Sequence, residues 1–270
     1  MLVNALVFMV IAAAAYLIRP SRRLLHLFVV SVWWLPLTTV TCWLFLQICR
    51  ISTERYDLYF YEADRFVFGV EPAFLVGQFL ADHPWINSLA RLDYDGSVYV
   101  TMALVLAMFL LESLRDAYRF LIATLATPVF AIPCYWLLPA CGPRYAFADF
   151  PNPASSVTPH ILNIANRPPN CLPSAHEASA ILVLVFLWRW RTGRIVGLLH
   201  LVLTSVATLG IGEHYGLDLL CAIPFIIGLL QLSSWIVDWP AWPAWRCIGG
   251  DGDVVDGNVP AWEGTEGWLP

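Results

Sequence analysis

Apolar residues gather in seven long runs along the chain, separated by polar turns and by two longer polar segments. A helix that crosses a bilayer needs about 20 mostly apolar residues. We therefore predict an all-α fold, a polytopic membrane helix bundle with about seven transmembrane helices. The fifth and sixth runs are short, which suits helices that begin inside a protein cavity. The runs cover residues 2–18, 24–49, 97–112, 118–139, 174–188, 195–212 and 216–237.

The segments between these runs divide the chain into parts with different expected roles. Residues 50–96 mix aromatic and polar side chains, which predicts short helices at the membrane interface. The loop 140–173 is dense in proline, and such a loop is more often functional than a plain connector. We divide the chain into an N-terminal transmembrane helix with its cytoplasmic turn (1–23), a membrane domain that carries the chemistry (24–237) and a flexible cytoplasmic tail (238–270).

Arginines mark three of the short connections between apolar runs. By the positive-inside rule these connections are cytoplasmic, and each lies two membrane crossings from the next, so the assignment is self-consistent. It places the N-terminus and the segments 50–96 and 140–173 outside the cytoplasm. The three clusters are Arg19/Arg22/Arg23, Arg115/Arg119 and Arg189/Arg191/Arg194.

Composition strengthens the membrane assignment and removes several function classes. Hydrophobic residues make up 59% of the chain and charged residues 13%, with a mean hydropathy of +0.66. These values exclude a disordered chain, a basic nucleic-acid binder and a typical cytosolic enzyme. We expect an integral membrane protein, and we interpret its location as a bacterial inner membrane. The sequence contains no lysine, which excludes Schiff-base and P-loop lysine chemistry.

The seven cysteines give little support to metal or redox motifs, because no CxxC pair occurs. Cys141 and Cys171 flank the proline-rich loop, so a disulfide between them is one alternative if the loop faces an oxidising compartment. Free thiols are the other alternative. We expect neither a metal ion nor a cofactor.

Two histidine motifs stand at the predicted outer ends of helices, and their chemistry suits phosphoryl transfer. His214 and Asp218 are four residues apart and share a helix face. The carboxylate can fix the imidazole tautomer and leave the other ring nitrogen as a nucleophile. His176 can protonate the leaving oxygen and later activate water. Ionisable groups at the membrane edge are by default candidates for a functional site.

Candidate phosphate ligands lie near the same helix ends. Arg144 and Arg167 can bind phosphoryl oxygens through paired N–H groups. Ser174 and the N–H groups that open the fifth apolar helix add donors where the helix dipole favours an anion.

Together these motifs resemble the type 2 phosphatidic acid phosphatase (PAP2) superfamily. The resemblance is closest to its inositol-phosphorylceramide-synthase-like branch and covers roughly residues 60–237. The motifs that carry it are Asn-x-x-Pro-Ser-x-His over 170–176, Gly-x-His-Tyr-x-x-Asp over 212–218 and Asp-x-x-x-Phe-Gly-x-x-Pro over 64–72.

The resemblance implies a six-helix core and specific roles for the motif residues. His214 would accept the phosphoryl group, Asp218 would support it and His176 would act as the acid and base. Further candidates for substrate-binding or tuning roles are Asn170, Tyr145, Glu213, Tyr215 and His160, with Glu213 chosen for its place beside His214. The family pattern Lys-x6-Arg-Pro lacks its lysine here, and His160 and Arg167 take that spacing.

The sequence supports two classes of function. The first is a metal-independent enzyme that removes or transfers a phosphate-linked lipid head group outside the cytoplasm, with lipids and the membrane as partners and no nucleic acid. The alternative is a non-enzymatic membrane protein, either a transporter or a bis-His haem protein. We expect His200 to be structural or interfacial. For Asp57, Glu62 and Asp64 the alternatives are a role in ordering the outer segment, contact with a head group, and a solvated amphipathic face, which we favour.

Overall fold

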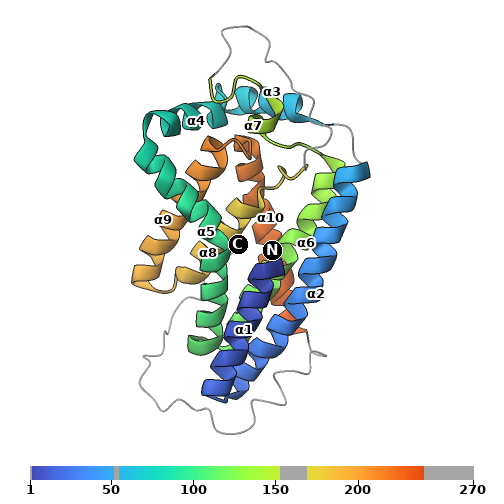
Figure 1. Ribbon diagram of the computed structural model, residues 1–270, viewed down its shortest axis with the longest axis vertical. Helices are drawn as coiled ribbons and strands as arrows, with labels where there is room; N and C mark the ends of the chain where they lie inside the picture. The colour runs from blue at the N-terminus through green and yellow to red at the C-terminus, as the bar shows by residue number, and fades with distance from the viewer. Residues whose placement is uncertain (1, 52–54, 153–168, 240–270) are drawn as a thin grey trace, which may run out of the picture.

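The computed structural model describes residues 2–51, 55–152 and 169–239, and within these ranges every element is a helix (Figure 1). The long helices stand side by side, and two short ones, α3 and α4, lie across one end of the bundle. The predicted all-α membrane bundle is therefore confirmed. The helices are α1 (Leu2–Ile18), α2 (Arg22–Ile51), α3 (Asp57–Phe68), α4 (Pro72–Asp82), α5 (Pro84–Leu111), α6 (Leu114–Leu137), α7 (Pro143–Ala146), α8 (Ala175–Leu187), α9 (Arg191–Gly210) and α10 (Gly216–Asp238).

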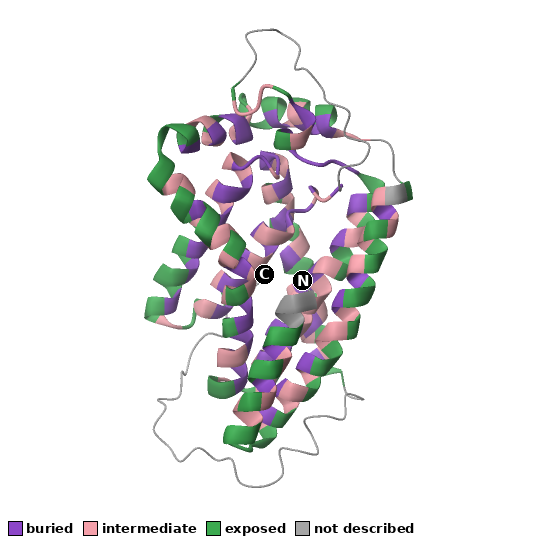
Figure 2. Ribbon diagram, viewed as in Figure 1, coloured by how far each residue is buried: buried purple, intermediate pink, exposed green. Residues whose placement is uncertain are grey.

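Five of these helices, α2, α5, α6, α9 and α10, are long and apolar enough to cross a membrane. The apolar helices α1 and α8 are shorter, and with the five they account for the seven predicted runs. Large apolar side chains on outer faces are exposed, for example Trp33, Leu111 and Ile195, and Figure 2 shows exposed residues along the outer faces of the long helices. Such a surface suits lipid as its solvent.

Only the first part of the segment 50–96 forms short helices, which corrects the prediction that the whole segment does. Its first part forms α3 and α4 across the end of the bundle, as expected (Figure 1). Residues 84–96, however, belong to the long helix α5, which begins with Pro84 in its first turn. Proline suits this position because its missing N–H would have had no partner there. The polar residues of this stretch suggested a surface segment, but Asp93 turns inward and binds α9.

The arginine-bearing turns meet at the end of the bundle opposite α3 and α4. Arg23 donates to the carbonyl oxygen of Glu112 at 3.1 Å, and Arg189 pairs with the Glu112 carboxylate. Arg115 pairs with Asp238, the last residue of α10, at 2.9 Å. Exposed pairs of this kind contribute little to stability, because water screens the attraction between the charges. Their value here is geometric, because they join the α1–α2, α5–α6 and α8–α9 turns to the end of α10.

Candidate active site

The two motif histidines come together at the starts of neighbouring helices. His176 is the second residue of α8, whose N-cap residue Ser174 accepts a hydrogen bond from Glu177 N. His214 lies just before α10, and the Ser174 N–H donates to the carbonyl oxygen of Asp218 in its first turn. The centroids of the two imidazole rings are 6.5 Å apart. Residues 38 positions apart in the sequence therefore share one site.

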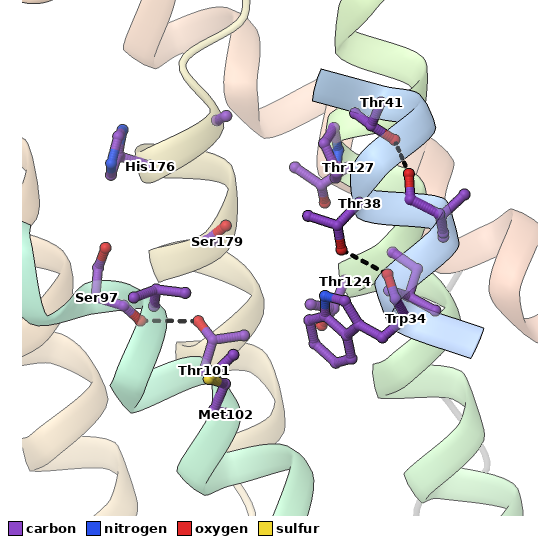
Figure 3. A pocket seen from close by; sticks show the side chains of 15 residues that line it. Trp34, Thr38, Thr41, Ser97, Thr101, Met102, Thr124, Thr127, His176 and Ser179 are labelled. Carbon is purple, nitrogen blue, oxygen red and sulfur yellow. Dashed lines mark hydrogen bonds between the residues drawn. The ribbon is translucent and has the colours of Figure 1, made fainter. Parts of the chain in front are cut away.

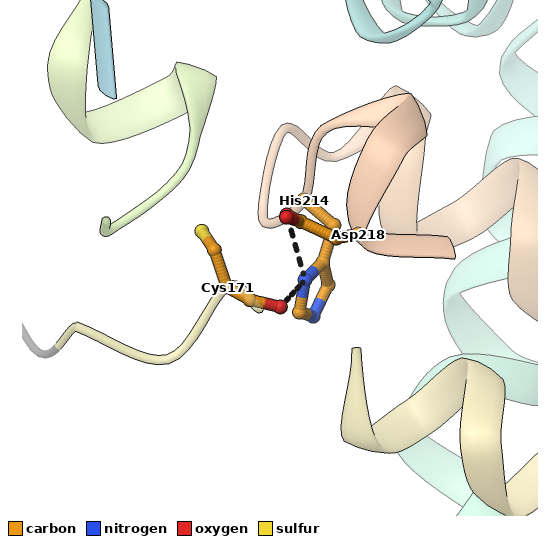
Figure 4. A group of neighbouring side chains, drawn as sticks. All are labelled: Cys171, His214 and Asp218. Carbon is orange, nitrogen blue, oxygen red and sulfur yellow. Dashed lines mark hydrogen bonds and ion pairs between the residues drawn. The ribbon is translucent and has the colours of Figure 1, made fainter. Parts of the chain in front are cut away.

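A hydrogen bond to the Cys171 carbonyl fixes the proton on His214, and the Asp218 carboxylate lies near the same nitrogen. Its Nδ1 lies 3.1 Å from the carbonyl oxygen of Cys171 and 3.5 Å from Oδ2 of Asp218 (Figure 4). A carbonyl oxygen can only accept, so Nδ1 must carry the hydrogen. Nε2 then keeps its lone pair and is the nucleophilic nitrogen of this ring. The tautomer is assigned from these hydrogen-bonding partners.

Asp218 is fully buried and is held by the backbone of its own helix start. Its Oδ2 accepts a hydrogen bond from Tyr215 N at 2.8 Å in a capping box. Its Oδ1 has no hydrogen-bonding partner among the described residues. A carboxylate placed this way stabilises positive charge that forms on the neighbouring imidazole.

Two glycines let the loop before α7 pack directly against the His214 loop. Gly142 has φ 95°, and a Cβ there would lie 2.4 Å from the carbonyl oxygen of Glu213. Gly212 has φ 80°, and its carbonyl accepts a hydrogen bond from Arg144 N at 3.0 Å. Both positions need glycine because L-residues rarely adopt this conformation. The close packing brings Arg144 next to the histidine loop.

The outer rim of the site pairs an arginine with a glutamate. Glu213 Oε1 accepts a hydrogen bond from the Tyr145 hydroxyl at 2.9 Å and lies 3.4 Å from Arg144 Nη1. The Arg144 side chain is half exposed and its guanidinium lies over the Tyr145 ring. An anion that binds Arg144 must therefore compete with Glu213. Glu213 therefore pairs with Arg144, and the sequence did not suggest this contact.

Two aspartates of α3 are buried supports of the site, which corrects the predicted solvated face. Asp57 and Asp64 are each 1% exposed, while Glu62 is exposed as expected. Asp57 accepts hydrogen bonds from Cys141 N, Gly142 N and the Tyr215 hydroxyl. The reason for the error is that the partners are backbone N–H groups of distant loops, which leave no mark in the sequence around α3.

Asp64, on α3, binds the backbone of the first turn of α10. Its carboxylate accepts hydrogen bonds from Gly216 N at 2.7 Å and Leu217 N at 2.8 Å, two of the N–H groups that a helix start leaves unpaired. Burial raises the pKa of Asp64 to about 6, against the opposing effect of these two N–H donors. Burial also raises the pKa of Asp57, although the Tyr215 hydroxyl and the loop N–H groups oppose the shift.

His176 faces a cavity and stacks on a tyrosine. Its ring lies 4.1 Å from the ring of Tyr94 on α5, at an interplanar angle of 25°. Sequence reasoning missed Tyr94, because residues 50–96 were interpreted as a surface segment. The cavity, with a volume of about 340 Å³, extends from His176 between α2, α5, α6 and α8 (Figure 3).

Cys141 and Cys171 are buried free thiols, so the disulfide alternative is wrong for this structure. The Cys141 thiol donates to Asp57 and the Cys171 thiol donates to the carbonyl oxygen of Glu213. Each sulfur thus has a separate partner.

Cys171, His214 and Asp218 offer ligand atoms within 4.8 Å of one another, and this group could hold a metal ion. A coordinating cysteine must be a thiolate. Burial and the nearby Asp218 charge raise the pKa of the Cys171 thiol well above its usual value, so it stays protonated. Figure 4 shows the thiol turned away from the imidazole. The predicted absence of a metal stays a prediction.

The remaining predicted residues have varied positions. Asn170 directly precedes Cys171, and its Oδ1 is buried without a hydrogen-bonding partner in the described part of the chain. The Tyr215 hydroxyl is committed to Asp57. The Ser174 side chain is buried as the cap of α8. His160 and Arg167 lie outside the described residues, as does the tail from residue 240.

Comparison with known proteins adds one finding. A family model described as the PAP2 superfamily matches residues 59–232, more than half of the chain. The matched region begins in α3 and ends in α10, so it includes both histidine motifs and the buried aspartate Asp64. No curated protein and no solved structure matches the chain.

Proposed function

The chain belongs to the PAP2 superfamily, and we propose that it is a membrane-embedded lipid phosphatase or head-group phosphotransferase that works through a phosphohistidine. The observation that carries the proposal is the pairing of His176 with a His214 whose Nδ1 donates to the Cys171 carbonyl and faces the Asp218 carboxylate. This pairing supplies a nucleophile and a separate proton carrier at one site.

In the first half-reaction, Nε2 of His214 attacks the phosphorus of the donor lipid. The P–N bond forms as the P–O bond to the leaving alcohol breaks, and His176 gives its proton to the leaving oxygen. The buried Asp218 stabilises the positive charge on the phosphorylated imidazole. Arg144 moves from Glu213 to the phosphoryl oxygens and neutralises their charge.

In the second half-reaction, His176 takes the proton of the acceptor O–H. The acceptor oxygen attacks phosphorus, the P–N bond breaks and its electron pair returns to Nε2 of His214. Water as acceptor makes the enzyme a phosphatase, and a lipid alcohol makes it a transferase. The motif over residues 170–176, with its resemblance to the inositol-phosphorylceramide-synthase-like branch, supports the transferase.

The site lies outside the cytoplasm in this proposal. Both histidines lie at the helix ends opposite the arginine-bearing turns, because α8 runs from His176 to the turn of Arg189 and α10 runs to Asp238, which pairs with Arg115. The positive-inside rule assigns the arginine end to the cytoplasm. A lipid substrate of the outer leaflet can then reach the site without crossing the membrane.

Turnover of a substrate panel by the purified protein tests the function. We expect release of phosphate or exchange of head groups from phospholipids, prenyl phosphates or sphingolipids, and we expect EDTA to leave the rate unchanged. His214→Ala should abolish turnover while the protein keeps its elution volume and helical circular dichroism. The non-enzymatic alternatives predict no turnover, and a haem protein predicts a Soret band. Wild-type turnover by His214→Ala would contradict the mechanism.

A further inference from the structure

We infer that Glu177 is a further positioning residue of the reaction, whose buried carboxyl keeps the proton that His176 passes to the leaving oxygen. The carboxyl holds this proton as an uncharged acid and recovers it from the acceptor in the second half-reaction. The inference rests on the proposed function. It gives a role to a buried carboxyl that the proposed mechanism leaves unused and that acts on the substrate only through His176.

Glu177 stands where a helix cap is expected, but its carboxyl is turned elsewhere. Serine at the N-cap and glutamate three residues later predict a capping box, in which the glutamate side chain binds the N–H of the serine. Here the Ser174 N–H donates to the carbonyl oxygen of Asp218 at 3.3 Å. The Glu177 carboxyl contacts the Ser205 hydroxyl of α9 and is buried there, with 7% of the residue exposed. Its position in α8 therefore does not explain its use.

The hydrogen bonds around Ser205 place a proton on Glu177. The Ser205 hydroxyl oxygen lies 2.9 Å and 3.0 Å from the two carboxyl oxygens of Glu177 and 2.8 Å from the carbonyl oxygen of Leu201. A hydroxyl has a single hydrogen to donate, so it cannot satisfy both the carbonyl and an ionised carboxylate. If the acid carries a proton, its O–H donates to Ser205 and Ser205 donates to Leu201. Burial favours the same state, because an unpaired charge is costly away from water.

The two histidines that act on the charge of Glu177 already have carboxylates of their own. His214 Nδ1 lies 3.5 Å from Asp218 Oδ2, and His200 Nδ1 lies 2.8 Å from Asp93 Oδ1. While both rings are neutral, neither supplies a cation for an ionised Glu177, so the resting carboxyl stays an acid. A cation that forms on His214 favours the loss of its proton. Further ionisable groups near the start of α8 are His176, Tyr94 of α5 and Tyr135 of α6.

A proton stored on His176 as a cation would be less stable. His176 faces the cavity of Figure 3, and the described residues that line this cavity include no carboxylate to balance the charge. The cation would also lie close to the one that forms on His214, because the two ring centroids are 6.5 Å apart. Like charges at a buried site disfavour each other. An uncharged acid behind the two rings avoids both effects.

The step balances with Glu177 as the source of the proton. Nε2 of His214 forms the P–N bond as the P–O bond to the leaving alcohol breaks. The leaving oxygen takes a proton from His176, which takes the proton of Glu177. The products are a neutral alcohol, a cationic phosphohistidine and a Glu177 carboxylate, so the net charge of these residues does not change. In the second half-reaction the acceptor proton returns through His176 to Glu177, and the electron pair of the P–N bond returns to Nε2.

The dependence of the first turnover on the leaving group tests the inference. The donors are dodecyl phosphate, whose alkoxide must be protonated as it leaves, and p-nitrophenyl phosphate, whose phenolate needs no acid. We expect Glu177→Gln to slow alcohol release from dodecyl phosphate about a hundredfold or more, a typical contribution of a general acid. The burst of p-nitrophenol should change little. Glu177→Asp keeps an acid and should regain part of the rate with dodecyl phosphate.

Glu213→Gln is the matched control, because it removes the glutamate that pairs with Arg144 beside the same histidines. It should change the rates with the two donors by the same factor. Equal losses with both donors in Glu177→Gln would overturn the inference, since a merely structural role slows both. Absence of a p-nitrophenol burst in the wild type would instead contradict the proposed function.

Infrared spectroscopy of the resting protein in an ester-free detergent gives a measurement that needs no turnover. A protonated carboxyl has a C=O stretching band apart from the bands of carboxylates. The wild-type spectrum should contain one such band that Glu177→Gln lacks, with the elution volume confirming that the variant is folded. Identical spectra in this region would overturn the inference.

Discussion

Tyr94 sets the plane of the His176 ring, since the two rings stack at 4.1 Å. Replacement of Tyr94 by Ala leaves the imidazole free to rotate, and a misplaced acid or base loses much of its effect. We expect Tyr94→Ala to lower kcat by about tenfold to a hundredfold with little change in KM. Tyr94→Phe keeps the stacked ring and should restore kcat in the same steady-state assay. A Phe variant as slow as the Ala variant would show that the hydroxyl, and not the stacking, is what matters.

The three proposed catalytic residues could be selected from the sequence, whereas the backbone group that orients His214 could not. His214 and Asp218 stand four apart, and His176 follows the serine that caps its helix, so the spacing alone indicates their roles. The Cys171 carbonyl that fixes the His214 proton is a backbone group of a distant loop. Any residue type at position 171 would present it, and therefore the sequence holds no signal for it.

At the scale of elements, α3 positions two parts of the site through carboxylates seven residues apart. Asp57 binds the loop before α7, and Asp64 binds the start of α10. Seven residues are two helical turns, so both side chains leave the same face of α3. The spacing of the two aspartates in the sequence indicates that they share a helix face. It does not show whether that face is buried or solvated. The start of α5 was missed for a similar reason, because Asp93 turns inward and binds His200 and Thr204 of α9.

The raised pKa of Asp64 makes stability depend on pH. The folded protein holds the Asp64 proton up to about pH 6, whereas an ordinary aspartate loses it near pH 3.8. Between these values the folded state binds more protons than the unfolded state, so this group's contribution to stability falls as pH rises and is lost above about pH 6.

Thermal unfolding of the purified protein between pH 4 and 7 checks this expectation. Asp64→Asn cannot ionise, so its melting temperature should fall less steeply with rising pH than that of the wild type, although the absolute value should be lower. Glu62→Gln is the control on the same helix, because Glu62 is exposed. Identical slopes for the wild type and Asp64→Asn would rule out burial of an ionising Asp64.

At the scale of the whole molecule, the arginine-bearing turns lie together at one end of the bundle. The positive-inside rule predicts that this end faces the cytoplasm. Arg23, Arg115 and Arg189 all bind groups at that end, while both histidines open helices at the other. The number of apolar runs and the clustering of arginine were enough to predict this arrangement. The packing of α3 and α4 across the site end required the structure, because it depends on contacts between distant segments.

Reporter fusions in a bacterial host test the orientation. Green fluorescent protein at the C-terminus should fluoresce, because the end of α10 lies at the predicted cytoplasmic face. Alkaline phosphatase inserted after Asn152, beyond α7, should be active, because it matures outside the cytoplasm. An active alkaline phosphatase at the C-terminus would reverse the assigned orientation.

The central claim is that His214 carries the phosphoryl group and that His176 serves both halves of the reaction. The most direct measurement is mass spectrometry of His176→Gln mixed with p-nitrophenyl phosphate, whose good leaving group needs no acid. The account predicts a burst of one p-nitrophenol per protein, followed by slow turnover, with an acid-labile phosphate on the peptide that contains His214. A phosphate on another residue, or full turnover with no adduct on His214, would contradict it.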